Sequence, residues 1–379
     1  MFVLVPLFLL GCDDNDNKET CHLLPSAFPQ DTVLSGCYEA QQTPTIADGV
    51  TITLEPGTVI SFAENTGFTF SEGHTLIAAG TEANPILLTG MVKERGSWLG
   101  LRFDMSDSTE NALEYVTIEY AGSTTADNDP DSAAVKLTSD SRPVTLNITN
   151  SIIRESDGWG LWLNGSSVMP LFSNNVFTAN TLGPASIDSS SGDLLDAGSA
   201  YTGNDIDMIR VRTNQIDENA TWAALDVPYF ITAGLNVNAQ WTLSPGVTLV
   251  MGEEAWISVN GDLAALNAVG TMENPILITG EEPTAGYWSS IHIDGSNNGL
   301  NAFEYVTVEY GGGGEDQYDL GQIVAVSDSH GVTLDVANCT IRSSSSYGIY
   351  LGFYADYNDD IETSNTFSDN TSGDVFYDQ

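Results

Sequence analysis

The phrase at Gly80–Gly90 reads GTEANPILLTG, and it returns at Gly270–Gly280 as GTMENPILITG. The phrase at Asn111–Tyr120, NALEYVTIEY, returns in the same way at Asn301–Tyr310 as NAFEYVTVEY. Both phrases recur after a shift of about 190 positions. Self-similarity at a fixed period is typical of repeat architectures, in which each unit buries its apolar face against its neighbour.

Short runs of alternating apolar and polar residues fill both copies, and Gly, Asn, Asp, Ser or Pro interrupts them. This punctuation is typical of strands and turns, and no sustained 3.6-residue periodicity accompanies it. Residues 100–103, 134–137 and 160–163 share one pattern, as expected for strands stacked in successive coils. We therefore predict an all-β chain that forms a right-handed parallel β-helix with two internal repeats of about 190 residues.

The alternation also predicts which side chains face the core. We expect seven residues to be buried: Leu101, Val116, Ile118, Leu161, Ile291, Val306 and Ile349. A register error of one residue would exchange the buried and exposed sets, because side chains alternate between the two faces of a strand.

Four phrases carry a family resemblance: Pro56-Gly57, Gly80-Thr81-x-x-Asn84-Pro85-Ile86, Trp98-x-Gly100-Leu101 and Leu113-x-Tyr115-x-x-Ile118. They resemble phrases of bacterial right-handed parallel β-helix lipoproteins of the pectin-lyase-like fold. The resemblance covers about residues 45–379 and implies the fold. It implies little about activity, because that fold hosts lyases, hydrolases, adhesins and proteins without known activity.

The repeats and the composition divide the chain into five segments. These are a lipoprotein signal peptide with lipobox at 1–12, an acidic tether at 13–32, the first β-helix repeat at 33–183, connector and restart coils at 184–242, and the second repeat at 243–379. We expect one continuous solenoid rather than two separate domains.

The N-terminus predicts a membrane anchor. Met1–Leu10 is an apolar run too short to span a bilayer, and Leu9-Leu10-Gly11-Cys12 resembles the lipobox of bacterial lipoproteins. The resemblance implies that Cys12 is lipidated and that the protein lies in the cell envelope, at the outer membrane or cell surface. A buried N-terminal strand is the alternative interpretation.

The chain has 10 Lys and Arg against 52 Asp and Glu, which gives a net charge of −42. Such a field repels phosphate and excludes nucleic acid as a partner. Carboxylates also bind hard cations, and acidic loops follow the Glu-Tyr strand in both copies. Calcium is the one cofactor candidate, and its candidate ligands are Asp127, Asp129, Asp131, Glu315, Asp316 and Asp319. Clustering by chance and salt adaptation are the alternatives.

Export to an oxidising compartment gives the cysteines separate roles. We expect Cys21 and Cys37 to form a disulfide that closes a small loop at the start of the solenoid. Cys339 is expected to pack as a small buried side chain.

One exposed strand face is the candidate binding site. Arg102, Lys136 and Trp162 are predicted to point outward from successive coils, and the second copy places His292, Ala325 and Tyr350 at the corresponding positions. Cations bind carboxylates and indole rings stack on sugars, so this row predicts a glycan site. The alternative is a row of ordinary solvated side chains.

Other recurring polar residues are expected to be structural. Arg154 aligns with Glu119, and Arg342 aligns with Glu309, as cross-strand ion pairs do; we prefer this interpretation to a catalytic arginine. Three asparagines recur at one position and are expected to stack their amides: Asn150, Asn174 and Asn338.

The sequence therefore favours a lipid-anchored, envelope-exposed β-helix that binds a glycan or a surface partner and has no catalysis of its own. A polysaccharide lyase or glycoside hydrolase using the Arg102–Lys136 face is one alternative, and a structural spacer or adhesin is another. Hydrolytic signatures such as paired carboxylates with a partnered histidine are not recognised in the sequence.

Overall fold

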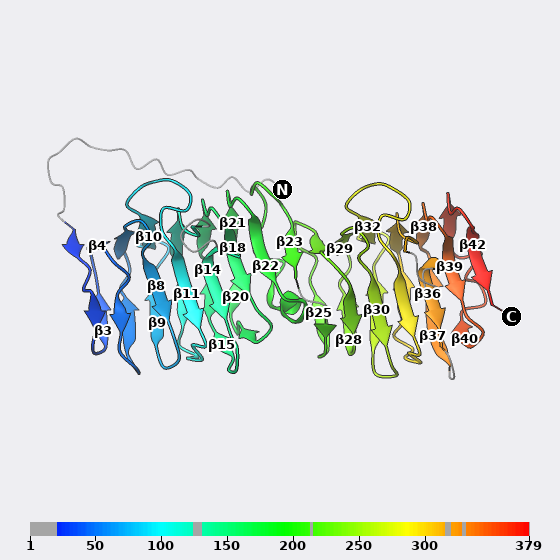
Figure 1. Cartoon of the computed structure of the whole chain (residues 1–379), viewed down its shortest axis with the longest axis horizontal. Coiled ribbons are helices and arrows are strands. Elements are labelled where there is room, and N and C mark those ends of the chain that lie inside the picture. Colours follow the sequence, from blue (N-terminus) through cyan, green and yellow to red (C-terminus); the bar gives the residue numbers. More distant parts are fainter. Residues whose placement is uncertain (1–20, 124–130, 213–214, 315–319, 328–330, 379) are drawn as a thin grey trace.

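The computed structural model describes residues 21–123, 131–212, 215–314, 320–327 and 331–378. These residues form a right-handed parallel β-helix whose coils stack along one long axis (Figure 1). The predicted fold class is confirmed. Cys12 and the rest of the predicted signal peptide lie outside the described residues.

Five large sheets of parallel strands make up the faces of the solenoid. Sheet I contains β1 (His22–Leu23), β4 (Cys37–Ala40), β7 (Val59–Phe62), β10 (Ile86–Gly90), β13 (Val116–Glu119), β17 (Ile152–Arg154) and β21 (Val176–Thr178). Sheet II contains β8 (Gly67–Phe70), β11 (Gly100–Asp104), β14 (Ala133–Thr138), β18 (Trp159–Leu163), β22 (Gly183–Ile187), β23 (Ile209–Val211), β26 (Tyr229–Ile231), β29 (Thr248–Met251), β32 (Ile276–Gly280), β35 (Val306–Glu309), β38 (Thr340–Arg342) and β41 (Thr366–Ser368).

The other sheets each belong to one half of the chain. Sheet III contains β3 (Thr32–Leu34), β6 (Thr51–Leu54), β9 (Thr75–Ala79), β12 (Ala112–Glu114), β16 (Asn147–Thr149) and β20 (Phe172–Ser173). Sheet IV contains β24 (Gln215–Ile216), β27 (Leu235–Val237), β30 (Ile257–Asn260), β33 (Ile291–Asp294), β36 (Gly321–Val326), β39 (Tyr347–Leu351) and β42 (Gly373–Tyr377). Sheet V contains β25 (Ala220–Trp222), β28 (Gln240–Leu243), β31 (Ala265–Val269), β34 (Ala302–Glu304), β37 (Val332–Ala337) and β40 (Ala355–Tyr357).

Two small strand pairs and one short helix complete the described elements. The pairs are β2 (Ala27–Phe28) with β5 (Thr45–Ile46), and β15 (Val144–Thr145) with β19 (Ser167–Val168). The helix η1 is a 3₁₀ helix at Ser189–Leu194. Within the described ranges, no helix is long and apolar enough to cross a membrane.

The core runs through the centre of the coils. All seven residues predicted to face inward are at most 1 % exposed, which confirms the register of those strands: Leu101, Val116, Ile118, Leu161, Ile291, Val306 and Ile349. Aromatic rings stack between coils, as where Phe70 and Phe103 pair in register with ring centres 5.3 Å apart and 21° between the ring planes. In-register stacking of this kind buries apolar area while parallel strands satisfy the backbone.

The copied residues occupy equivalent structural positions in the two halves. The indole Nε1 of Trp98 donates to the Glu119 carbonyl, and that of Trp288 donates to the Glu309 carbonyl, each over 2.9 Å. A close backbone contact explains why glycine recurs at the position of Gly80: a Cβ there would lie 2.7 Å from the Tyr115 carbonyl oxygen. The repeated phrases therefore record turns and buried hydrogen bonds.

The two copies face in different directions around the axis. The copied phrases make β10 equivalent to β32, yet β10 lies in sheet I and β32 in sheet II. Likewise β11 lies in sheet II, and its equivalent β33 lies in sheet IV. The second copy is therefore displaced by one sheet, because coils differ in length and a shift of about 190 residues is not a whole number of coils.

Sheet II passes through both copies without interruption, so the described chain is one continuous stack (Figure 1). Between the copies, η1 packs against β24 and β25, at the transition from sheets I and III to sheets IV and V. A Cβ at Gly192 in η1 would lie 2.2 Å from the Trp222 ring, so this junction requires a residue without a side chain.

Candidate functional site

The outward row on sheet II brings the first three candidate residues together. Arg102 on β11 pairs in register with Lys136 on β14, which pairs with Trp162 on β18. The same row then continues through Ser186 on β22 and Arg210 on β23. Successive coils therefore align these side chains along the axis of the solenoid, with a spacing of ~4.8 Å between neighbouring strands.

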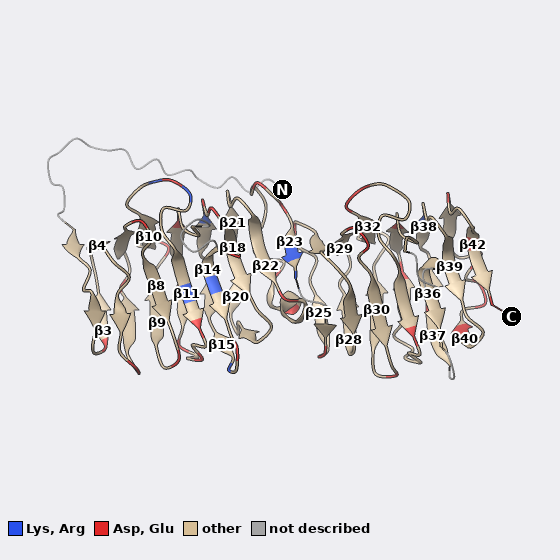
Figure 2. Ribbon diagram, in the orientation of Figure 1, with Lys and Arg blue, Asp and Glu red and all other residues tan. Residues whose placement is uncertain are grey.

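This face holds a large share of the positive charge of an acidic molecule. Figure 2 shows basic residues on β11, β14 and β23 among strands that otherwise carry few charges. Of the 10 Lys and Arg in the chain, four lie here: Arg102, Lys136, Arg210 and Arg212. Sequence reasoning missed Arg210 and Arg212 because they lie in the connector, outside the copied phrases. The sequence pattern that could have identified them is the alternation Arg210, Val211, Arg212, in which a buried apolar residue separates two outward arginines.

A depression of about 200 Å³ lies at the start of this row. Arg102 and Lys136 line it together with Thr43, Thr69, Ser123 and Ser132, and its floor and walls come from Gly67, Phe68, Leu99, Gly100, Leu101 and Ala133. The Arg102 side chain is 48 % exposed, and its guanidinium lies 3.8 Å from the Asp104 carboxylate. Cations beside hydroxyls and backbone groups are suited to a ligand that carries both a carboxylate and hydroxyls.

Trp162 does not take the role that the sequence predicted. Its side chain was expected to face solvent, but the residue is 9 % exposed. The Lys136 ammonium lies 4.8 Å from the centre of the indole ring, and the Arg212 guanidinium lies 3.8 Å from it. Long cationic side chains from coils on either side cover the indole, because the ring attracts them and their alkyl stems pack on it. A sugar ring therefore has no open indole face to stack on.

Arg212 and Asp188 form a partly desolvated ion pair behind the row. The Arg212 Nη2 atom lies 2.9 Å from Asp188 Oδ1, and the two side chains are only 13 % and 14 % exposed. Burial raises the pKa of Asp188, and the nearby Arg212 only partly opposes this change. Burial likewise lowers the pKa of Arg212 against the opposing effect of Asp188. The pair thus holds Arg212 in place over Trp162.

The second-copy candidates lie on a different sheet. His292 on β33 and Tyr350 on β39 belong to sheet IV, so the five candidate residues do not form one surface row. The residue between them in register is Val324, and Ala325 faces the core. The assignment of Ala325 was wrong by one residue.

The Tyr350 ring already has a stacking partner within the protein. Its ring stacks on Phe376 at 5.0 Å with 16° between the planes. Burial raises the pKa of Tyr350, and the carboxylate of Asp378 adds to the effect. The nearby Asp378 carboxylate and the stacking on Phe376 distinguish Tyr350 from the cationic row on sheet II.

The recurring arginines form cross-strand ion pairs. Arg154 lies 2.7 Å from Glu119, and Arg342 lies 2.6 Å from Glu309. Glu119 and Glu309 also accept hydrogen bonds of 2.9 Å from the hydroxyls of Thr89 and Thr279 in the preceding coil, which draws three coils together at each position.

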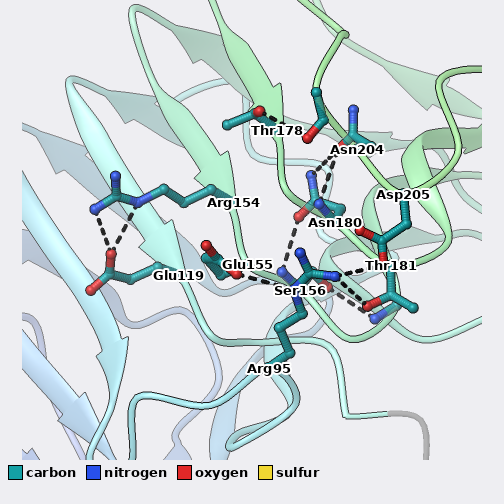
Figure 3. Close-up of polar contacts among 12 residues, drawn as sticks. Arg95, Glu119, Arg154, Glu155, Ser156, Thr178, Asn180, Thr181, Asn204 and Asp205 are labelled. Carbon is teal, nitrogen blue, oxygen red and sulfur yellow. Dashed lines mark hydrogen bonds and ion pairs between the residues drawn. The ribbon is translucent and has the colours of Figure 1, made fainter.

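Figure 3 shows the first of these pairs beside a second arginine, Arg95, that bridges still more distant coils. Arg95 contacts Glu155 at 3.0 Å and Asp205 at 2.8 Å, and it donates to the Thr181 hydroxyl over 3.1 Å. Burial acts to lower the pKa of Arg95, but its hydrogen bonds to the two carboxylates outweigh burial and raise the pKa. These contacts fit a structural role.

The three recurring asparagines share a backbone conformation at the turn. Asn150, Asn174 and Asn338 adopt left-handed backbone conformations, with φ of 52°, 56° and 57°. The backbone N–H groups of the residues that follow two of them donate to asparagine side chains of the next coil: Ser151 N–H donates to Asn175 Oδ1 over 3.1 Å, and Cys339 N–H donates to Asn365 Oδ1 over 2.8 Å. Asparagine tolerates the left-handed region, which accounts for its recurrence at the turn.

The cysteines and acidic loops complete the candidate residues. Cys21 and Cys37 form a disulfide in the structure. Cys339 is a buried thiol, and burial raises its pKa to about 12. Of the calcium candidates, only Asp131 is among the described residues, and it lies 3.7 Å from Arg210. Asp127, Asp129, Glu315, Asp316 and Asp319 lie outside them. The described part of the chain contains no group of three or more potential metal ligands.

No family model, curated protein or solved structure matches this chain.

Proposed function

We propose that this protein is a lipid-anchored β-helix of the cell envelope that binds an acidic glycan on sheet II and has no catalysis of its own. The observation that supports it is the depression between Arg102 and Lys136, which places two cations beside hydroxyl groups on the surface of a chain of charge −42. A carboxylate of the glycan would accept hydrogen bonds from Arg102 and Lys136, and neighbouring sugar hydroxyls would meet Thr69 and Thr43.

The charge of the whole molecule restricts the ligand further. A densely charged polyanion would be repelled by the surrounding carboxylates before it reached the row, because the field of −42 charges acts over the Debye length of ~8–10 Å. A glycan with isolated acidic sugars among neutral ones avoids most of this repulsion. We therefore propose a sparsely charged glycan that carries carboxylates, bound by polar contacts rather than by aromatic stacking.

A binding role accounts for the depression better than hydrolysis does. Glycosidases act with two carboxyl groups that flank the scissile bond. The described residues that line the depression supply a guanidinium, an ammonium and hydroxyls, and none of them is Asp or Glu. Its volume of about 200 Å³ is also below the ~300–1,000 Å³ of typical ligand pockets, which suits one subsite on an extended surface.

The anchor belongs to the same proposal and rests on the sequence. The apolar run followed by Leu9-Leu10-Gly11-Cys12 resembles a lipobox, as in β-helix lipoproteins of the pectin-lyase-like fold. Changing Cys12 to Ser is expected to move the protein out of the membrane fraction. Unchanged fractionation and an N-terminus without lipid mass would remove the anchor from the proposal.

The glycan proposal is tested by screening residues 21–379 on a glycan array. We expect selective binding to glycans with spaced carboxylates and weaker binding to neutral and densely sulfated ones. Arg142→Gln is the matched control for Arg102→Gln, because both remove one exposed arginine and Arg142 pairs with Glu72, which is not among the residues that line the depression. Binding to neutral glycans alone would contradict the proposal, and cleavage of a bound glycan would favour the lyase or hydrolase alternative.

A further inference from the structure

Further along sheet II lies a cluster of buried donors that the glycan site does not use. Four buried side-chain atoms of this cluster have no hydrogen-bond partner among the described residues: Trp159 Nε1, Trp162 Nε1, Ser186 Oγ and Arg212 Nε. Buried polar groups in proteins are almost always paired, so several such donors near one another are suited to bind a ligand or water.

The four residues are neighbours. Trp162 and Ser186 face each other in register on β18 and β22. The guanidinium of Arg212 reaches back to within 3.8 Å of the centre of the Trp162 ring. Trp159 packs against Trp162 in a small apolar cluster that is separate from the main core. The four residues therefore lie around one junction of β18, β22 and the end of β23.

The chemistry of this junction favours an acceptor of negative charge. Two indole N–H groups and a guanidinium N–H can only donate, and the Ser186 hydroxyl can donate as well. Three cations surround the indoles, since Lys136 and Arg212 lie over Trp162 and Arg210 lies 5.8 Å from the Trp159 ring. Among the described residues, Asp188 pairs with Arg212 and Asp131 lies near Arg210, so carboxylates offset part of this positive charge.

We infer that the Trp162–Ser186–Arg212 junction binds a small inorganic anion of the halide class. A halide accepts several N–H and O–H donors without directional constraint, whereas a water molecule accepts about two hydrogen bonds and its own hydrogens need acceptors. The burial limits the size of the ligand, because Ser186 is 0 % and Trp162 is 9 % exposed. The inference does not depend on glycan binding. It does connect to that site, since Lys136 both covers Trp162 and lines the depression.

Crystals grown in sodium bromide test the site directly. Diffraction at the bromine absorption edge is expected to show an anomalous peak within hydrogen-bond distance of Trp162 Nε1, Ser186 Oγ and Arg212 Nε. The solution test compares the unfolding temperature in chloride and in gluconate at equal ionic strength. Chloride is expected to raise it at millimolar concentration, because a ligand that binds only the folded state stabilises that state.

Conservative variants separate binding from general stability. Trp162→Phe keeps an aromatic ring between the cations and removes the N–H, and Ser186→Ala removes the hydroxyl; each is expected to abolish the chloride-specific shift. Ser191→Ala is the matched control, because its hydroxyl is also buried and without a partner among the described residues but lies in η1. A junction that holds only water, with no bromine peak and equal stability in chloride and gluconate, would overturn the inference. A chloride shift that persists in both variants would overturn it as well.

Discussion

Glu119 and Glu309 each hold an arginine of the next coil and a threonine of the preceding one, although they are only 8 % and 9 % exposed. A carboxylate so close to the core requires these partners, because an unpaired buried charge is costly. The Glu–Arg pair therefore recurs in both copies because the buried glutamate requires a charged partner, and the recurrence does not indicate a catalytic arginine.

Changing Arg342 to Met tests this role. We expect a loss of ~1–3 kcal/mol in the free energy of unfolding, because among the described residues the Glu309 carboxylate would keep the hydrogen bond from Thr279 alone. Arg142→Met is the control and should change stability by less than ~1 kcal/mol, since Arg142 and Glu72 are both 52 % exposed. The measurement is urea unfolding of both variants, and equal losses would show that burial of Glu309 has no energetic effect.

The elements show how far the sequence determines the fold. The buried sides of β11, β13, β18 and β33 were predictable, because a parallel stack with one buried face leaves a strict alternation in the sequence. The disulfide partners could also be named before the structure. The copied phrase at Gly270–Gly280 correctly predicted a turn equivalent to the one in Gly80–Gly90.

The relation between the copies was not predictable in the same way. Equivalence in sequence preserves local turns, but the sheet that a strand joins depends on the summed lengths of all preceding coils. His292 therefore lies on sheet IV although Arg102 lies on sheet II. Burial of Trp162 could not be predicted either, because the residue that covers it, Arg212, follows β23 and lies 50 positions further along the chain.

The N-terminal coil gives a prediction at the scale of elements. The Cys21–Cys37 disulfide spans a separation of 16 residues beside the pairing of β1 with β4. Loss of the disulfide is expected to lower the free energy of unfolding by ~3 kcal/mol. The destabilisation should be confined to the N-terminal coils, because each coil contacts mainly its neighbours. Hydrogen exchange of the Cys21→Ser/Cys37→Ser variant should show faster exchange in β1 to β4 and unchanged protection from β10 onward. Uniformly faster exchange would contradict such local coupling.

At the scale of the whole molecule, charge is distributed very unevenly. Eight of the 10 basic residues lie between Lys93 and Arg212, and the second repeat at 243–379 contains one, Arg342, so its charged residues are almost all acidic. Repulsion between stacked coils should therefore be strongest there, and cations should relieve it. Specific calcium binding and general screening by salt make different predictions.

Calcium binding in the acidic loops is expected to raise the unfolding temperature at sub-millimolar calcium. Asp127→Asn/Asp129→Asn should lose this response while keeping the response to sodium chloride. The measurement is thermal unfolding in calcium and in sodium at matched ionic strength. An equal response to both ions would assign the acidity to surface adaptation and remove calcium from the account.

The central claim is that the cationic row on sheet II binds an acidic glycan. The most direct measurement is calorimetric titration of the preferred glycan into three proteins: the unchanged chain, Arg102→Gln/Lys136→Gln and the control Arg142→Gln. Two lost charge-assisted hydrogen bonds of ~1.5–3 kcal/mol each predict an affinity at least about 100-fold lower for the double variant. The control should bind like the unchanged protein. Equal affinity of the double variant and the unchanged protein would show that the glycan binds elsewhere and would contradict the account.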